Sequence, residues 1–160
     1  MKVLITGATG FIGQALSAEL LKKEFDLTVV LKKKSALFTD SVNQIVVSDF
    51  SANTNWDQIL ENIDCVIHLA GKANVVDKSR EPTLDEFRKI NTNLTLNLAK
   101  QAAKYSVKRF VFLSSIGVSG NQNNKPFNES DVPDPQDSYA VSKYEAEQGL
   151  FKISKNTNLE

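Results

Sequence analysis

The feature that most constrains this chain is a glycine-rich turn near its start, Thr6-Gly7-Ala8-Thr9-Gly10-Phe11-Ile12-Gly13. A short apolar run precedes the turn and an apolar-periodic run at residues 11–21 follows it, which predicts a strand and then a helix. Gly7 permits a tight turn, Gly10 leaves room for a phosphate, and Gly13 lets helix and strand pack closely. We therefore expect a dinucleotide to bind here, against the free N–H groups of the first helical turn. An ordinary strand-to-helix turn is the alternative, because three glycines alone are a weak signal.

Apolar and amphipathic runs alternate along the rest of the chain. Runs typical of strands lie at residues 2–6, 27–31, 45–48, 65–69 and 109–113. Runs typical of helices lie at residues 11–23, 56–61, 83–104 and 138 to about 155. Several of the strands are apolar throughout, as in a parallel sheet that is covered on both faces. The alternation predicts an α/β fold with right-handed crossovers, a Rossmann-type doubly wound parallel sheet.

Length, charge and apolar content narrow the class of protein. A chain of 160 residues suits one domain, so we expect a single nucleotide-binding domain over residues 1–160. Its 19 basic and 19 acidic side chains balance, which argues against nucleic acid or a membrane surface as a partner. No apolar stretch approaches the length of a membrane span, and the start leaves no room for a signal peptide. We therefore expect a cytoplasmic protein.

Neither the single cysteine nor the single histidine predicts a metal site. Cys65 lies in an apolar run, and one cysteine excludes an internal disulfide and a cysteine-rich metal site. His68 is more typical of a core or crevice-lining histidine than of a metal ligand, because no second ligand is suitably spaced. Lys72 and Lys78 follow the same strand and could attract a diphosphate, although solvated loop lysines are the simpler interpretation.

A second constellation lies at the start of the last expected helix. Tyr139 and Lys143 are four residues apart, so they share one helical face. A lysine ammonium beside a phenol lowers the phenol's pKa and makes the phenolate available as a base. Ser115, at the end of the fifth expected strand, could hydrogen-bond a substrate oxygen whose charge changes during a reaction. The alternatives are a solvated helix face for the pair and a capping role for the serine.

These motifs together resemble the extended short-chain dehydrogenase/reductases. The resemblance rests on the glycine turn, His68-Leu69-Ala70-Gly71, Asn91-Thr92-Asn93, Ser114-Ser115 and Tyr139-Ala140-Val141-Ser142-Lys143, in this order and spacing. The chain looks like the NAD-dependent epimerase/dehydratase branch, whose members act on nucleotide sugars. Within that branch it is most similar to UDP-glucose 4-epimerase-like proteins and 4-keto-sugar reductases of polysaccharide pathways. The resemblance implies oxidoreductase chemistry at C4 of a nucleotide sugar, carried out through a bound nicotinamide cofactor.

The resemblance also assigns roles to individual residues. The implied cofactor-binding residues are Gly7, Gly10, Phe11, Ile12, Gly13, Asp49, Phe50, Leu69, Ala70, Gly71, Asn91, Tyr139 and Lys143. Asp49 would contact the adenine amine, and Asn91 would line the cofactor crevice. A turn aspartate and a packing asparagine are the respective alternatives. Ser115, Tyr139 and Lys143 match the catalytic triad, with Lys143 also binding the ribose hydroxyls.

One departure from the family pattern bears on the cofactor. NAD-specific members carry an acid at the end of the second strand, where this chain has Leu31-Lys32-Lys33-Lys34. A basic residue such as Lys32 suits the 2′-phosphate of NADP, whereas a solvated basic turn would leave NAD as the cofactor. We favour NADP, and NADP in turn favours a reductase, because a reductase must exchange its cofactor and an epimerase recycles it.

A second departure is length, because family members continue with a C-terminal domain that grips the nucleotide sugar. We therefore expect an N-terminal fragment, truncated on the C-terminal side of the sheet and inactive by itself. The resemblance also implies a homodimer formed through the long helix and the Tyr139–Lys143 helix, with a UDP-sugar as substrate. The competing hypothesis is a non-catalytic NAD(P)-binding module or sensor.

Overall fold

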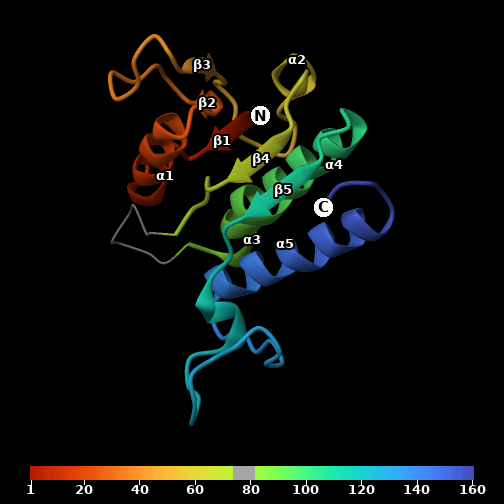
Figure 1. Ribbon diagram of the computed structural model, residues 1–160. Coiled ribbons are helices and arrows are strands. Elements are labelled where there is room, and N and C mark those ends of the chain that lie inside the picture. Colours follow the sequence, from red (N-terminus) through yellow and green to blue (C-terminus); the bar gives the residue numbers. More distant parts are fainter. Residues whose placement is uncertain (74–81) are drawn as a thin grey trace.

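A computed structural model describes residues 1–73 and 82–160, and it contains the predicted parallel sheet (Figure 1). The strands pair in parallel in the order β3-β2-β1-β4-β5. Their bounds are β1 Lys2–Thr6, β2 Asp26–Leu31, β3 Asn43–Val46, β4 Cys65–His68 and β5 Arg109–Phe112. All five expected strands are confirmed, but β3 begins two residues earlier than predicted. Its first residues, Asn43 and Gln44, are polar, which an edge strand paired only with β2 can accommodate.

The helices cover both faces of this sheet, with α1 on one face and α4 and α5 on the other (Figure 1). Their bounds are α1 Phe11–Lys22, α2 Asp57–Leu60, α3 Leu84–Phe87, α4 Thr95–Lys104 and α5 Ser138–Lys155. The single helix expected at residues 83–104 is interrupted by a π-helical segment, η1 Arg88–Leu94. A short 3₁₀ helix, η2 Ile116–Ser119, was not expected from the sequence. No helix in the described part of the chain is long and apolar enough to cross a membrane.

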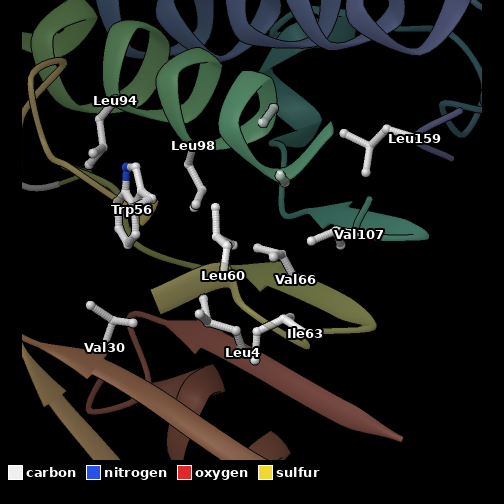
Figure 2. Close-up of a cluster of buried hydrophobic side chains, with 12 residues drawn as sticks. Leu4, Val30, Trp56, Leu60, Ile63, Val66, Leu94, Leu98, Val107 and Leu159 are labelled. Atoms are coloured by element: carbon white, nitrogen blue, oxygen red, sulfur yellow. The ribbon is translucent and has the colours of Figure 1, made fainter. Parts of the chain in front are cut away.

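The apolar strands are explained by one core on each face of the sheet. Leu4, Val30 and Val66 point toward α4 and pack with Trp56 and Leu98, as Figure 2 shows. The residues that alternate with them along the strands form the second core, under α1; its strand members are Val3, Ile5, Leu27, Val29, Leu31 and Cys65. Because successive strand residues point to opposite faces, a sheet covered twice requires apolar residues at every position.

The strand order places a crevice at the carboxyl ends of the central strands. The chain runs outward from β1 through β2 to β3 and then returns to the other side of β1 as β4. The connections that leave the carboxyl ends of β1 and β4 therefore diverge, and open α/β sheets bind their ligands at such a reversal. The glycine turn follows β1, and residues 69–71 follow β4, so both reach this point.

Candidate functional site

The glycine turn is shaped by close contact with the loop after β4. Gly7 has a φ of +73°, and a Cβ there would lie 2.6 Å from the Ala70 nitrogen. At Gly13 a Cβ would lie 2.7 Å from Ala8 Cα, so the first turn of α1 could not pack against the glycine turn. Among the described residues, a Cβ at Gly10 would meet only the Gly7 oxygen, at 3.3 Å. The interior of the protein therefore requires Gly7 and Gly13, whereas the outer side of Gly10 is open to a ligand.

The first turn of α1 presents unused hydrogen-bond donors at this opening. Gly10 caps the helix without a side-chain hydrogen bond, and no acidic residue lies in the first turn. Within the described part of the chain, the amides of Phe11, Ile12 and Gly13 have no acceptor. Free amides and the positive end of the helix dipole favour an anion at this place. The turn thus fits the pyrophosphate of a dinucleotide.

A cleft of about 880 Å³ extends from this turn across the carboxyl ends of the strands. Its lining residues are Gly7, Thr9, Gly10, Val30, Leu31, Lys32, Lys33, Lys34, Ser35, Leu37, Phe50, Leu69, Ala70, Gly71, Lys72, Ala73 and Ile90. Among these described residues are four lysines and no carboxylate. The lysines at positions 32–34 form no ion pair with a described residue, so the described part of the cleft is positively charged. Lys78 lies outside the described residues.

Some of the predicted cofactor residues do not line this cleft, namely Phe11, Ile12, Gly13, Asp49, Asn91, Tyr139 and Lys143. Asp49 lies in the loop after β3, where its carboxylate accepts a hydrogen bond from the Ser51 hydroxyl at 2.8 Å. It lines a neighbouring hollow of about 410 Å³, whereas Phe50 lines the cleft itself and packs edge-on against Trp56. Asn91 is fully buried and lies behind the cleft wall. Direct cofactor contacts from Asp49 and Asn91 stay predictions.

Asn91 joins the loop after β4 to the helix that carries Tyr139 and Lys143. Its side-chain oxygen accepts from the Lys72 amide at 2.8 Å, and its nitrogen donates to the Lys72 carbonyl at 3.0 Å. The same nitrogen donates to the Ser142 hydroxyl at 3.0 Å. That hydroxyl in turn donates to the Tyr139 carbonyl at 2.7 Å. The cofactor cleft and the Tyr–Lys helix are thus connected through one buried amide.

His68 forms a second buried connection, and its hydrogen bonds fix its tautomer. The Thr95 hydroxyl donates to the Asn91 carbonyl at 2.7 Å, so it must accept from His68 Nε2, 2.9 Å away. Nδ1 then accepts from the Thr6 hydroxyl at 2.7 Å, and the Thr6 oxygen remains free to accept from the Ala70 amide at 3.3 Å. Burial, with the nearby positive charge of Lys143, lowers the pKa of His68 to about 3. The expected core histidine is confirmed as a buried neutral one.

The predicted catalytic residues lie on neighbouring elements. Tyr139 and Lys143 are in the first turns of α5, which Asp137 caps by accepting from the Ala140 amide at 2.7 Å. Ser115 follows β5 and caps η2 by accepting from the Gly117 amide at 3.2 Å. A Cβ at Gly117 would lie 3.4 Å from the Ala140 Cβ, so η2 brings Ser115 close to the start of α5. The serine therefore caps η2 in addition to any role in a reaction.

Lys143 is a buried lysine beside the sheet. It is 4% exposed, and its Nζ lies 3.9 Å from the centroid of the Phe112 ring on β5. Burial lowers its pKa to about 8, and Glu147 on the same helix partly opposes this. Phe112 and the hydroxyls of Thr6, Thr95 and Ser142 were not predicted from the sequence to take part in the site. A polar residue at the end of an apolar strand was the one signal that could have found Thr6.

Comparison with known proteins agrees with this geometry. The profile of the NAD dependent epimerase/dehydratase family matches residues 3–160. The chain belongs to this family. It is 38% identical to UDP-glucose 4-epimerase from Vibrio cholerae over 99% of its own length and 48% of the relative. It is 32% identical to UDP-glucose 4-epimerase from Neisseria gonorrhoeae over 97% of its length and 49% of the relative. The resemblance stated from the motifs is thereby confirmed.

Solved structures of nucleotide-sugar enzymes have the same fold. MoeE5 in complex with UDP-glucose and NAD superposes with a TM-score of 0.85 at 28% identity, over 100% of this chain and 52% of that one. UDP-glucuronic acid 4-epimerase from Bacillus cereus, in complex with UDP-glucuronic acid and NAD, gives 0.85 at 25% identity, over 99% and 54%. The chain thus spans about half the length of the relatives that it matches.

Proposed function

We propose that residues 1–160 are the nicotinamide-cofactor domain of an oxidoreductase that acts at C4 of a nucleotide sugar. The observation that carries the proposal is the arrangement of free amides, a basic cleft and the Tyr139–Lys143 pair around one edge of the sheet. Relatives with this fold bind UDP-sugars and NAD, which supports a UDP-sugar as substrate. The length of these relatives supports a further substrate domain in the whole protein.

The residues of this chain can divide the chemistry among them. The amides of Phe11, Ile12 and Gly13 would hold the pyrophosphate, and a bound nicotinamide would supply the hydride acceptor or donor. In an oxidation Tyr139 would take the proton from the C4 hydroxyl, and in a reduction it would give a proton to the C4 oxygen, while Ser115 would hold the same oxygen. Lys143 follows Tyr139 by four residues, on the same face of α5, and would bind the ribose hydroxyls of the cofactor.

We further propose that the cofactor is NADP and the reaction a reduction of a 4-keto sugar. The support is the charge of the cleft, because its lining within residues 1–73 and 82–160 has four lysines and no carboxylate. A carboxylate there would repel a 2′-phosphate, whereas Lys32 and Lys33 would each add a charge-assisted hydrogen bond to it. An epimerase that retains NAD is the second candidate, favoured by the NAD found in the similar structures.

The experiment is a titration of the purified chain with NADPH and with NADH, read by nicotinamide fluorescence. We expect tighter binding of NADPH, and we expect Lys32→Ala/Lys33→Ala to weaken NADPH about tenfold or more while leaving NADH nearly unchanged. Lys100→Ala, an exposed lysine on α4, is the matched control and leaves both affinities unchanged. Equal binding of the two cofactors would return the assignment to NAD, and binding of neither would remove the cofactor-domain proposal.

The activity of the chain by itself is a separate part of the proposal. We expect no turnover of UDP-sugars by residues 1–160, because the relatives are about twice as long. Product formation by the purified chain, followed by mass spectrometry, would contradict this. A cytoplasmic location and a homodimer through the long helix and α5 stay predictions, and sedimentation across a concentration series tests the dimer.

A further inference from the structure

Lys143 lies against an aromatic ring on β5. The residue is 4% exposed, and among the described residues its Nζ forms no hydrogen bond or ion pair. Nζ instead lies above the face of the Phe112 ring, 3.9 Å from the ring centroid. A cation above the face of an aromatic ring is attracted by the ring's negative quadrupole, and more strongly when both are withdrawn from water.

The ring of Phe112 is itself fixed in place. The His68 imidazole stacks on it with ring centroids 6.1 Å apart and planes only 17° from parallel. His68 is anchored at both nitrogens, by the hydroxyls of Thr6 and Thr95. Lys143 is therefore linked through Phe112 to His68, and through the hydrogen bonds of His68 and Thr6 to the loop after β4.

We propose that Phe112 is a positioning residue for Lys143, whose ring face holds the ammonium in place, and that stacking on His68 keeps this ring oriented. The proposal rests on the proposed function, in which Lys143 serves Tyr139 and a cofactor ribose. It adds that the lysine is already charged and oriented before a ligand arrives. Without the ring, an ammonium in this place would have to turn toward water or lose its proton.

Because of the charges around Lys143, its own protonation state is a sensitive measure of the contact with Phe112. His68 on β4 is neutral, Glu147 on α5 is one turn away, and burial, partly opposed by Glu147, lowers the pKa of Lys143 to about 8. Because this value lies close to neutral pH, loss of the ring's attraction would leave a large neutral fraction at pH 7.

The experiment is an NMR titration of Lys143 in the free 160-residue chain, using lysine labelled with ¹³C at Cε and Lys143→Arg to assign the signal. We expect Phe112→Leu to lower the pKa of Lys143 by about one pH unit. Phe112→Tyr keeps the ring face and is expected to keep the value of the wild type. Phe110→Leu is the matched control, since the Phe110 and His68 ring centroids are 6.0 Å apart but no described lysine lies above the Phe110 ring.

The wild-type protein provides a second test that does not depend on the folding of a variant. The Cε protons of Lys143 should be shifted upfield by the Phe112 ring current and should show Overhauser contacts with its ring protons. Absence of both, an unchanged pKa in Phe112→Leu, or an equal decrease in Phe110→Leu would each overturn the proposal. None of these measurements uses a cofactor, so a failure of NADPH or NADH to bind would count against the proposed function alone.

Discussion

Acidification should destabilise this protein through its single histidine. His68 is neutral in the folded chain, where it accepts a hydrogen bond from Thr6 and donates one to Thr95. A proton on Nδ1 would remove the acceptor that Thr6 needs and place a second positive charge near Lys143. The folded state therefore resists a proton that the unfolded chain binds readily.

The size of the effect follows from the two pKa values. The pKa is about 3 in the folded protein and about 6.5 in an unfolded chain. The unfolded state binds more protons between these values, so stability is complete above pH 6.5 and decreases as the pH falls toward 3. Between pH 7 and pH 5 the loss is about 2 kcal/mol. With a urea m value of about 2 kcal/mol/M, the unfolding midpoint decreases by about 1 M.

The assay is urea unfolding at pH 7, 6 and 5, followed by the fluorescence of Trp56, the only tryptophan and a fully buried one. His68→Gln is the matched variant, because an amide offers one acceptor and one donor but does not titrate in this range. We expect the midpoint of this variant to change little between pH 7 and pH 5. If His68→Gln showed the same decrease as the wild type, the histidine would not be its cause and the reasoning would be refuted.

Two further predictions test the glycine turn and the buried amide. Gly7→Ala should reduce the free energy of unfolding by about 2–4 kcal/mol, because it combines a left-handed φ with a backbone clash at Ala70. Gly10→Ala should reduce the free energy of unfolding by about 1 kcal/mol or less and yet weaken cofactor binding. Equal destabilisation by Gly7→Ala and Gly10→Ala would contradict this expectation. Asn91→Leu should cost about 2–4 kcal/mol, since it leaves the Lys72 amide and carbonyl without their partner. Asn93→Leu, at an exposed position of the same π-helical segment, is its control and should change urea stability by less than about 0.5 kcal/mol.

The strands of the sheet could be predicted well because each is marked by a pattern within a few consecutive residues. Strands covered on both faces are apolar at every position, so β1, β2 and β4 stand out as continuous runs. The edge strand β3 was misplaced by two residues, because its first two residues are polar. The glycine turn, Tyr139 and Lys143 were recognisable because each motif depends on short spacing within one strand–turn–helix unit or one helix.

The interior of the site could not be predicted in the same way. The π-helical segment at Arg88–Leu94 leaves the 3.6-residue pattern of the long helix almost intact, so periodicity gives no sign of it. Within that segment the Asn91 carbonyl accepts from the Thr95 hydroxyl, and the Asn91 side chain turns to Lys72 and Ser142. Such contacts join residues 19 and 51 positions apart, a separation at which no sequence pattern specifies a partner.

The same contacts explain how two distant motifs come to serve one site. The glycine turn and the Tyr–Lys pair belong to opposite ends of the chain, and apolar packing alone would hold them only loosely in orientation. Directional bonds through His68 and Asn91 connect the loop after β4 to both of them. Since each hydroxyl in this path both donates and accepts, removal of one group leaves its neighbours unsatisfied in the interior. Replacing Thr95 by the isosteric Val should therefore disturb the position of the site as well as the stability of the fold.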